Sequence, residues 1–227
     1  MKQRLASLAL LAVAASWGLT FVTMKDALNR QSVNSFLFYR FAIAALVLLI
    51  IHPQIIRKLN WDVIKHGGIP GLFLGAGFIV QTYGLHMTTA AVTGFITGLY
   101  VVATPLFEQI FGGKRLGLMV WISIAIATTG LALLSLHGAR IGLGEFLVLL
   151  CALFYTGQII GLSKWSAGRD VWTMTFVQIL VVAIMTGIAS LIEGFQSPPD
   201  SGVWGVILFT ALVCTVTAFI VQTWSQA

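Results

Sequence analysis

The sequence predicts an all-α integral membrane protein, a polytopic bundle of helices built from two related units. Its composition is 58% hydrophobic and only 9% charged, whereas a soluble domain usually carries about 25% charged residues. So few charges cannot cover a surface in water, but a surface that faces lipid needs none. The second observation is a repeat, because the string FIVQT occurs at 78–82 and again at 219–223.

Long apolar segments account for most of the chain. A helix needs about 20 mostly apolar residues to cross a bilayer, and eight segments of this kind are separated by short loops. No soluble domain is expected between them. The predicted spans are 5–25, 33–51, 66–86, 89–111, 116–136, 143–163, 171–192 and 203–224.

Basic residues orient the predicted bundle. Nine of the thirteen Lys and Arg residues fall on one side once the spans are threaded through a membrane in order. Because basic loops stay in the cytoplasm, we expect a multi-pass protein of the cell (plasma) membrane with a cytoplasmic N-terminus. The nine are Lys2, Arg4, Arg57, Lys58, Lys65, Lys114, Arg115, Lys164 and Arg169.

This distribution accounts for the net charge of +6 without a nucleic-acid partner. The expected partners are membrane lipid and a small-molecule substrate, and a homodimer is left open.

The repeated string belongs to a longer correspondence. Near the same offset, Trp17 falls on Tyr155 and Arg40 falls on Gln178. The last three spans therefore look like copies of the first three. One unit then has five spans, and because five is odd, the second copy enters the membrane in the opposite sense. Inverted repeats of this kind typically build one site at the middle of the bilayer.

The two units are predicted to be unequal in length. The first unit covers 1–138 with five helices, and the second covers 139–227 with helices six to eight. The duplication predicts inverted five-helix repeats, of which eight of an expected ten transmembrane helices are present. We therefore expect a chain truncated after the eighth helix.

Several stretches together resemble one known family. They are SWGLTFVTMKDAL, FLFYRFAIAALVLL, GLFLGAGFIVQTYGLHMTTAAVTGFITGLYVVATPLFE and GEFLVLLCALFYTGQIIGLSKWS. In order and spacing they resemble the EamA-type transporters of the drug/metabolite transporter superfamily. The resemblance implies ten helices in two inverted repeats. The chain departs from it at Lys114, where many members have glutamate, and in lacking helices nine and ten, of which the ninth normally lines the cavity.

Arg40 is the charged residue that lies deepest in a predicted span. A basic side chain at the centre of a spanning helix costs about 2.5–3.5 kcal/mol, so its presence asks for a reason. It can attract an anionic group of a substrate or balance an acid. The alternatives are that it snorkels to the membrane surface or pairs with Asp26.

Amides and polar aromatic residues are the other candidates. An amide that faced lipid would be left without hydrogen bonds, so these side chains should face the bundle, where they either join helices or line a cavity. The resemblance implies that helices one, three, four, six and eight form the cavity wall. With Arg40, the predicted substrate-binding residues are therefore Trp17, Gln81, Tyr100, Tyr155, Gln158 and Gln222.

Glycines recur at intervals of four residues within three spans. Small residues at this spacing let helices approach closely, either as static packing or as surfaces that slide. In the fourth span, Pro105 removes one helix hydrogen bond and predicts a kink. The glycine rows are Gly67, Gly71 and Gly75; Gly94 and Gly98; and Gly157 and Gly161.

The sequence lacks the motifs of an enzyme. GLFLGAG has no Lys-Ser/Thr after it and is not a phosphate-binding loop, and we find no HExxH, no CxxC and no Ser/His/Asp set. No catalytic residue, metal or cofactor is expected. We expect a secondary transporter of small metabolites, an exporter or exchanger working by alternating access. The alternative is a truncated membrane fragment or assembly partner that transports nothing.

Overall fold

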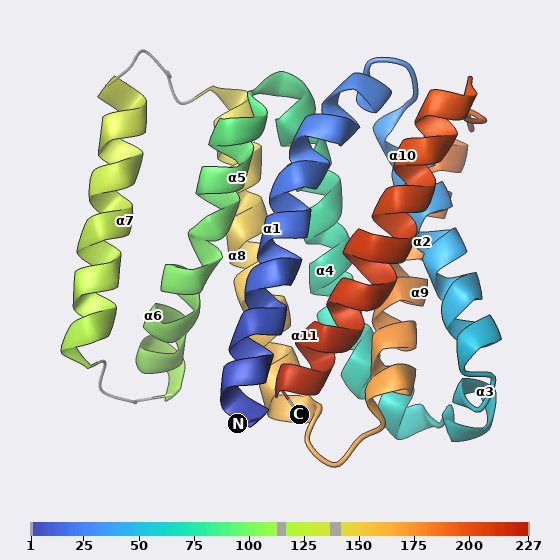
Figure 1. Cartoon of the computed structure of the whole chain (residues 1–227), viewed down its shortest axis with the longest axis horizontal. Coiled ribbons are helices and arrows are strands. Elements are labelled where there is room, and N and C mark those ends of the chain that lie inside the picture. Colours follow the sequence, from blue (N-terminus) through green and yellow to red (C-terminus); the bar gives the residue numbers. More distant parts are fainter. Residues whose placement is uncertain (1, 113–116, 137–141, 227) are drawn as a thin grey trace.

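A computed structural model describes residues 2–112, 117–136 and 142–226, and the fold is a bundle of helices lying side by side (Figure 1). Within the described residues there is no β-strand. The helices are α1 (Lys2–Leu28), α2 (Val33–Ile51), α3 (Ile55–Lys58), α4 (Trp61–Met87), α5 (Ala90–Gly98), α6 (Tyr100–Gly112), α7 (Leu118–Leu136), α8 (Leu143–Trp165), α9 (Val171–Glu193), α10 (Ser201–Ala211) and α11 (Ala218–Gln226), with the π-helix η1 (Leu212–Thr217) joining α10 to α11.

Six helical segments in the described ranges are long and apolar enough to cross a membrane. They coincide with six of the eight predicted spans, and the protein is an all-α, multi-pass membrane protein. The two other predicted spans, 5–25 and 116–136, fall on α1 and α7, and their crossing of the membrane stays a prediction. The six are Val33–Ile51, Trp61–Met87, Ala90–Ile110, Leu143–Trp165, Val171–Glu193 and Ser201–Gln222.

Helices predicted to be copies of each other run in opposite directions. In Figure 1, α1 rises from the lower end of the bundle while α8 descends from the upper end. In the same way α4 rises and the continuous segment α10–η1–α11 descends, so that the chain begins and ends at the same end. This is the arrangement that an inverted repeat requires. The predicted boundary between the units, at 138/139, lies outside the described residues.

The core lies where α4 packs against α8 and α9, and where α9 packs against α2. Glycines make the contact of α4 with α9 close. A Cβ atom added to Gly71 would lie 3.0 Å from the Cα of Gln178, and one added to Gly67 would lie 3.1 Å from the Cβ of Val177. A methyl group at either position would be closer to its neighbour than most Cβ contacts are, so glycine lets these two backbones approach.

The fourth span is interrupted rather than continuous. Helix α5 ends at Gly98 and α6 begins at Tyr100, and the backbone N–H of Leu99 donates to the carbonyl of Ile96, one residue short of the α-helical pattern. The interruption therefore precedes Pro105, through which α6 continues.

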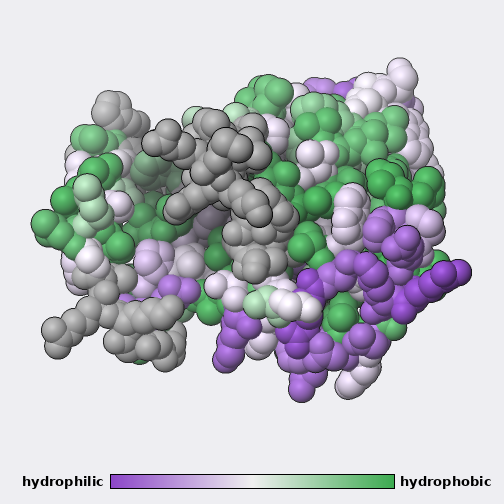
Figure 2. All heavy atoms as spheres, turned by 60° about the horizontal axis from the view of Figure 1, so that its bottom comes forward, coloured by the Kyte–Doolittle hydropathy of each residue, from purple (hydrophilic) through white to green (hydrophobic). Residues whose placement is uncertain are grey.

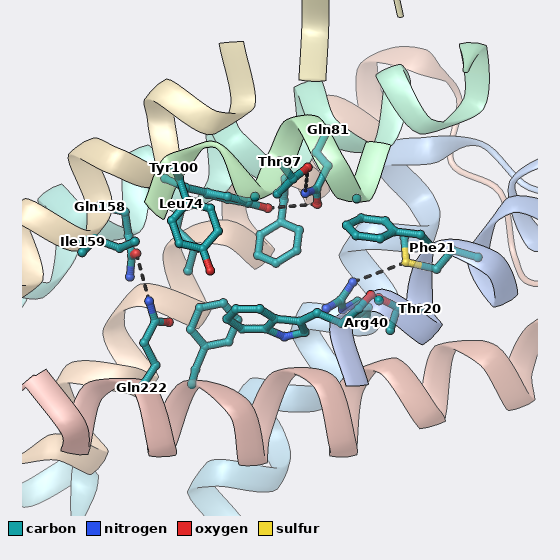
Figure 3. A pocket seen from close by; sticks show the side chains of 18 residues that line it. Thr20, Phe21, Arg40, Leu74, Gln81, Thr97, Tyr100, Gln158, Ile159 and Gln222 are labelled. Carbon is teal, nitrogen blue, oxygen red and sulfur yellow. Dashed lines mark hydrogen bonds between the residues drawn. The ribbon is translucent and has the colours of Figure 1, made fainter. Parts of the chain in front are cut away.

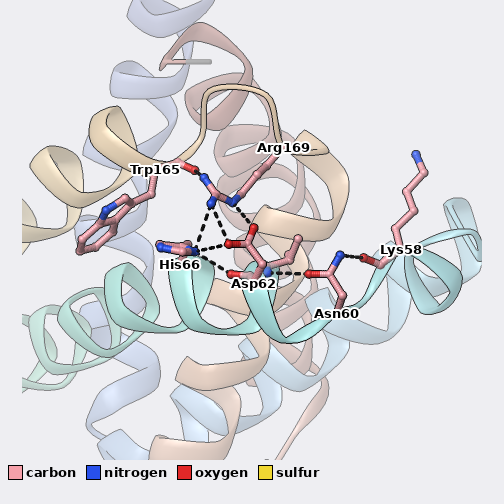
Figure 4. A network of polar contacts seen from close by, with 7 residues as sticks. Lys58, Asn60, Asp62, His66, Trp165 and Arg169 are labelled. Atoms are coloured by element: carbon pink, nitrogen blue, oxygen red, sulfur yellow. Dashed lines mark hydrogen bonds and ion pairs between the residues drawn. The ribbon is translucent and has the colours of Figure 1, made fainter.

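Ion pairs join the two units at the end where α3 lies (Figure 4). Arg169, in the loop between α8 and α9, donates from Nε and Nη2 to the Asp62 carboxylate at 2.7 and 2.9 Å. Lys58 also forms an ion pair with Asp170, in which Nζ lies 2.6 Å from Oδ1. The hydrogen bonds that Arg169 donates to the Asp62 carboxylate raise the pKa of Arg169.

A second link closes the opposite end. Arg30 pairs there with Asp26 at 2.6 Å and with Asp200 at 2.7 Å. The backbone N–H of Val203, together with Arg30, lowers the pKa of Asp200. Both ends of the bundle are thus held by contacts between the two units.

Basic side chains gather at the lower end of the bundle. Arg57, Lys58, Lys65 and Lys164 are exposed, and Figure 2, in which this end comes forward, shows a concentration of hydrophilic atoms on one part of it. Of the predicted basic set, Lys114 and Arg115 lie outside the described residues.

Candidate functional site

A cavity of about 310 Å³ lies among α1, α2, α4, α5, α6, α8 and α11. Pockets for small molecules usually measure about 300–1,000 Å³, so this one suits a small ligand. All seven predicted site residues lie on the wall of this cavity. Their binding of a substrate stays a prediction. They are Trp17, Arg40, Gln81, Tyr100, Tyr155, Gln158 and Gln222 (Figure 3).

Aromatic rings from both units meet beside the cavity. Phe78 and Phe219, the first residues of the two FIVQT strings, have ring centroids 6.1 Å apart. Trp17 packs on Phe219 at 5.8 Å, and its counterpart Tyr155 packs on Phe78 at 5.6 Å. Each aromatic residue thus contacts the string of the other predicted unit, so both predicted units contribute to one wall.

One polar arm of the site centres on Gln81. Its Nε2 donates to the hydroxyl of Thr97 at 3.0 Å, and its Oε1 accepts from the hydroxyl of Tyr155 at 3.0 Å. These bonds join α4, α5 and α8. Tyr100 packs edge-on to Tyr155, with ring centroids 6.2 Å apart.

The other polar arm centres on Gln222, the counterpart of Gln81. Gln222 Nε2 donates to Gln158 Oε1 at 3.3 Å, and Gln158 Nε2 donates to Gln178 Oε1 at 2.9 Å. Gln178 is 1% exposed and is not part of the cavity wall. Because these amides hydrogen-bond one another, they both join helices and present polar atoms to the cavity.

Arg40 is buried, with 2% of its surface exposed. Its Nε donates to the hydroxyl of Thr215 at 2.9 Å, and its Nη1 donates to the sulfur of Met24 at 3.6 Å. The guanidinium does not snorkel, and Asp26 pairs with Arg30 instead, so both alternatives for Arg40 from the sequence are wrong. Within the described residues no carboxylate forms an ion pair with Arg40.

The π-helix η1 positions the groups that face α1 and α2. The hydroxyl of Thr215 donates to the carbonyl of Thr210, five residues back, at 2.9 Å. The indole Nε1 of Trp17 donates to the carbonyl of Cys214 at 2.8 Å. Turns of this kind occur often at functional sites. Nothing in the string LVCTVT requires one, so sequence reasoning missed it.

Sequence reasoning also missed several apolar members of the wall. Phe78 and Phe219 stand three residues before Gln81 and Gln222, and residues three apart share a face of a helix. That spacing was the available signal. The other members not predicted include Thr20, Phe21, Met24, Leu74 and Thr97.

Comparison with known proteins agrees with this architecture. The model of the EamA-like transporter family matches residues 4–136 and 142–227. A protein of Archaeoglobus fulgidus described as an uncharacterized transporter is 30% identical over 232 aligned residues, which cover 100% of this chain and 71% of the relative.

A solved crystal structure of another protein is similar in fold, with a TM-score of 0.72 over 97% of this chain and 78% of its own. At 18% sequence identity, that similarity shows the fold alone. The family match extends over nearly the whole sequence. This chain therefore belongs to the EamA-like transporter family and is a transporter of the drug/metabolite type.

Proposed function

We propose that this protein is a secondary transporter that moves a small metabolite across a membrane by alternating access. The observation that carries the proposal is the cavity, whose wall takes matching residues from two antiparallel sets of helices. A site between inverted repeats can open to either side when one set rocks against the other.

The contacts at the two ends of the bundle fit this mechanism. Alternating access requires that contacts between the units break at one end while they hold at the other. Arg30 and Asp200 join the units at one end, and Asp62 and Arg169 join them at the other, all partly exposed. Exposed ion pairs are worth about 0–1 kcal/mol, so breaking them costs little.

We further propose a plasma-membrane exporter or exchanger whose N-terminus lies in the cytoplasm. The exposed residues Arg57, Lys58, Lys65 and Lys164 support this orientation because α3, the start of α4 and the end of α8, which carry them, lie at the end where α1 begins (Figure 1). Cytoplasmic loops usually carry such an excess of basic residues. The archaeal relative, which is described as a transporter, supports the activity.

The test is exchange of labelled solutes by the full chain reconstituted in proteoliposomes, with panels of amino acids, nucleobases and carboxylic acids. Gly18 lies on the cavity wall, and a Cβ atom there would meet nothing within 4 Å. We expect Gly18→Leu to fill the cavity and reduce exchange by about tenfold or more, because one tenfold step takes only about 1.4 kcal/mol.

The matched control is Gly205→Leu. Gly205 is also a helical glycine with nothing within 4 Å of an added Cβ, but it is not part of the cavity wall. It should leave exchange unchanged. Failure of the unmodified chain to exchange any solute would contradict the proposal and favour the non-transporting alternative.

A further inference from the structure

We propose that Arg40 is an anion-binding group and that the ligand of the cavity is a small organic anion with an apolar body. This inference rests on the proposed function, because it names the class of substrate for the same site. Three observations support it: the burial of the guanidinium, the neutrality of its partners, and the composition of the cavity wall.

Within the part of the chain that the structure describes, the buried charge of Arg40 has no counter-charge. Buried charges are normally paired with an opposite charge, yet among the described residues the guanidinium, 2% exposed, meets only neutral groups. They are the hydroxyl of Thr215, the sulfur of Met24, and the rings of Phe41 and Phe78, whose centroids lie 5.1 and 4.9 Å from the guanidinium carbon. These dipoles and ring faces hold the cation in place without neutralising it.

The hydrogen-bonding capacity of Arg40 is also not exhausted. Nε and Nη1 each donate once, and Nη2 donates to no group among the described residues. Arg40 lies on the cavity wall (Figure 3). A guanidinium presents its N–H groups as a planar fork that matches a carboxylate or a phosphate group. An anion in the cavity would complete this set of bonds.

The rest of the wall selects against other ligands. Among the described residues no Asp or Glu lines the cavity, so this wall offers no negative charge to a cationic substrate. Phe78, whose ring centroid lies 4.9 Å from the guanidinium carbon, and its neighbour Phe219 offer aromatic surface to the cavity. The amides of Gln81 and Gln222 can orient a polar substituent. A molecule with one anionic group and an apolar remainder fits these three surfaces together.

The experiment compares two probes of the same shape and different charge, benzoate and benzamide, at neutral pH. Binding to the full chain in detergent would be measured by isothermal calorimetry and by the shift in melting temperature. Because hydrogen bonds to charged groups contribute more than neutral ones, we expect benzoate to bind about tenfold to a hundredfold more tightly than benzamide.

Variants of Arg40 then assign the preference to this residue. Arg40→Gln should abolish the preference for benzoate, and Arg40→Lys should keep a weaker preference, because lysine retains the charge without the fork. Arg57→Gln, which removes an exposed cation away from the cavity, should keep the full preference. If Arg40→Gln fails to fold, the preference for benzoate over benzamide in the unmodified chain and its weakening in Arg40→Lys still test the inference.

Each outcome separates this inference from the proposed function. Equal binding of benzoate and benzamide would overturn the inference, while leaving a cavity that binds and transports neutral solutes. A preference for benzoate that survives in Arg40→Gln would place the anion elsewhere and would also overturn it. Failure of benzoate to bind the unmodified chain counts against it too, whereas the exchange assay judges the proposed function independently.

Discussion

Glycines spaced four residues apart face a neighbouring helix on α4 and a cavity on α5. On α4, a Cβ atom added to Gly71 would lie 3.0 Å from the backbone of α9. On α5, one added to Gly98 would meet nothing within 4 Å, and one added to Gly94 would meet only the ring of Phe21, at 3.5 Å. We call the first contact, around Gly67, Gly71 and Gly75, the tight seam, and the second, around Gly94 and Gly98, the open seam.

The comparison shows that the spacing of small residues does not by itself decide how close two helices come. What differs is the opposing helix. Helix α9 presents its backbone at Gln178 to α4, whereas α1 presents the ring of Phe21 to the open seam. A ring at this contact keeps α1 farther from α5 than a backbone contact would, and the cavity lies beside it. The tight seam joins the units, and the open seam holds the site.

The largest expected effect comes from placing a charge in the tight seam. Gln178 is 1% exposed, is the counterpart of Arg40, and hydrogen-bonds Gln158. We expect Gln178→Arg to lower the free energy of unfolding by about 3 kcal/mol, the cost of an arginine at the centre of a spanning helix. Arg40→Gln should change it by about 1 kcal/mol or less, because removing a buried charge also removes its desolvation cost.

Both values can be measured by chemical denaturation in detergent micelles. Equal destabilisation by the two variants would mean that a charge added at position 178 costs no more than the loss of Arg40, and the close packing of the tight seam at Gln178 would be wrong.

The next effect is steric and needs only one methyl group. Gly71→Ala would push its Cβ against the Cα of Gln178, which is backbone and cannot move aside. Overpacking of this kind costs about 1–3 kcal/mol, and we expect about 2 kcal/mol in the same measurement. Gly205→Ala is the control: with nothing within 4 Å, it should raise stability by up to about 1 kcal/mol. If both variants gained stability, the close approach of α4 to α9 would be wrong.

Much of the fold follows from the sequence because lipid imposes simple requirements. Long apolar segments had to be helices, and the predicted unit of five spans, an odd number, predicts an inverted second copy. The repeat also carried information about the site. Positions matched between the copies, such as Gln81 with Gln222 and Trp17 with Tyr155, do lie on one cavity wall.

The remaining features depend on contacts that no single helix specifies. Both faces of a membrane helix are apolar, so periodicity does not tell which glycine row meets a backbone and which meets open space. The π turn at Cys214 and Thr215 is favoured by what it contacts, namely Trp17 and Arg40, rather than by its own residues. For the same reason the surroundings of Arg40 could not be predicted.

A smaller effect of opposite sign is expected in the open seam. Gly98→Ala adds a methyl group where nothing lies within 4 Å, and it replaces the residue that loses the most conformational entropy on folding. We expect a gain in the free energy of unfolding of about 0.5–1 kcal/mol. The same denaturation experiment measures it. A loss of stability at Gly98, similar to that at Gly71, would show that the seam is closed and that no room remains for a ligand.

The smallest effect concerns the ion pairs at the end of the tight seam. Asp62 receives two hydrogen bonds from Arg169, which ties α4 to the loop before α9, whereas among the described residues no ion pair joins α1 to α5. Asp62→Asn should lower the melting temperature slightly at low ionic strength. Because the Debye length is only about 3 Å at 1 M salt, the difference should vanish there. The loss caused by Gly71→Ala is steric and should persist at every salt concentration. If the effect of Asp62→Asn also persisted in high salt, the contact between Asp62 and Arg169 would stabilise the protein through hydrogen-bond geometry rather than through charge. Breaking that contact during transport would then not depend on electrostatic attraction.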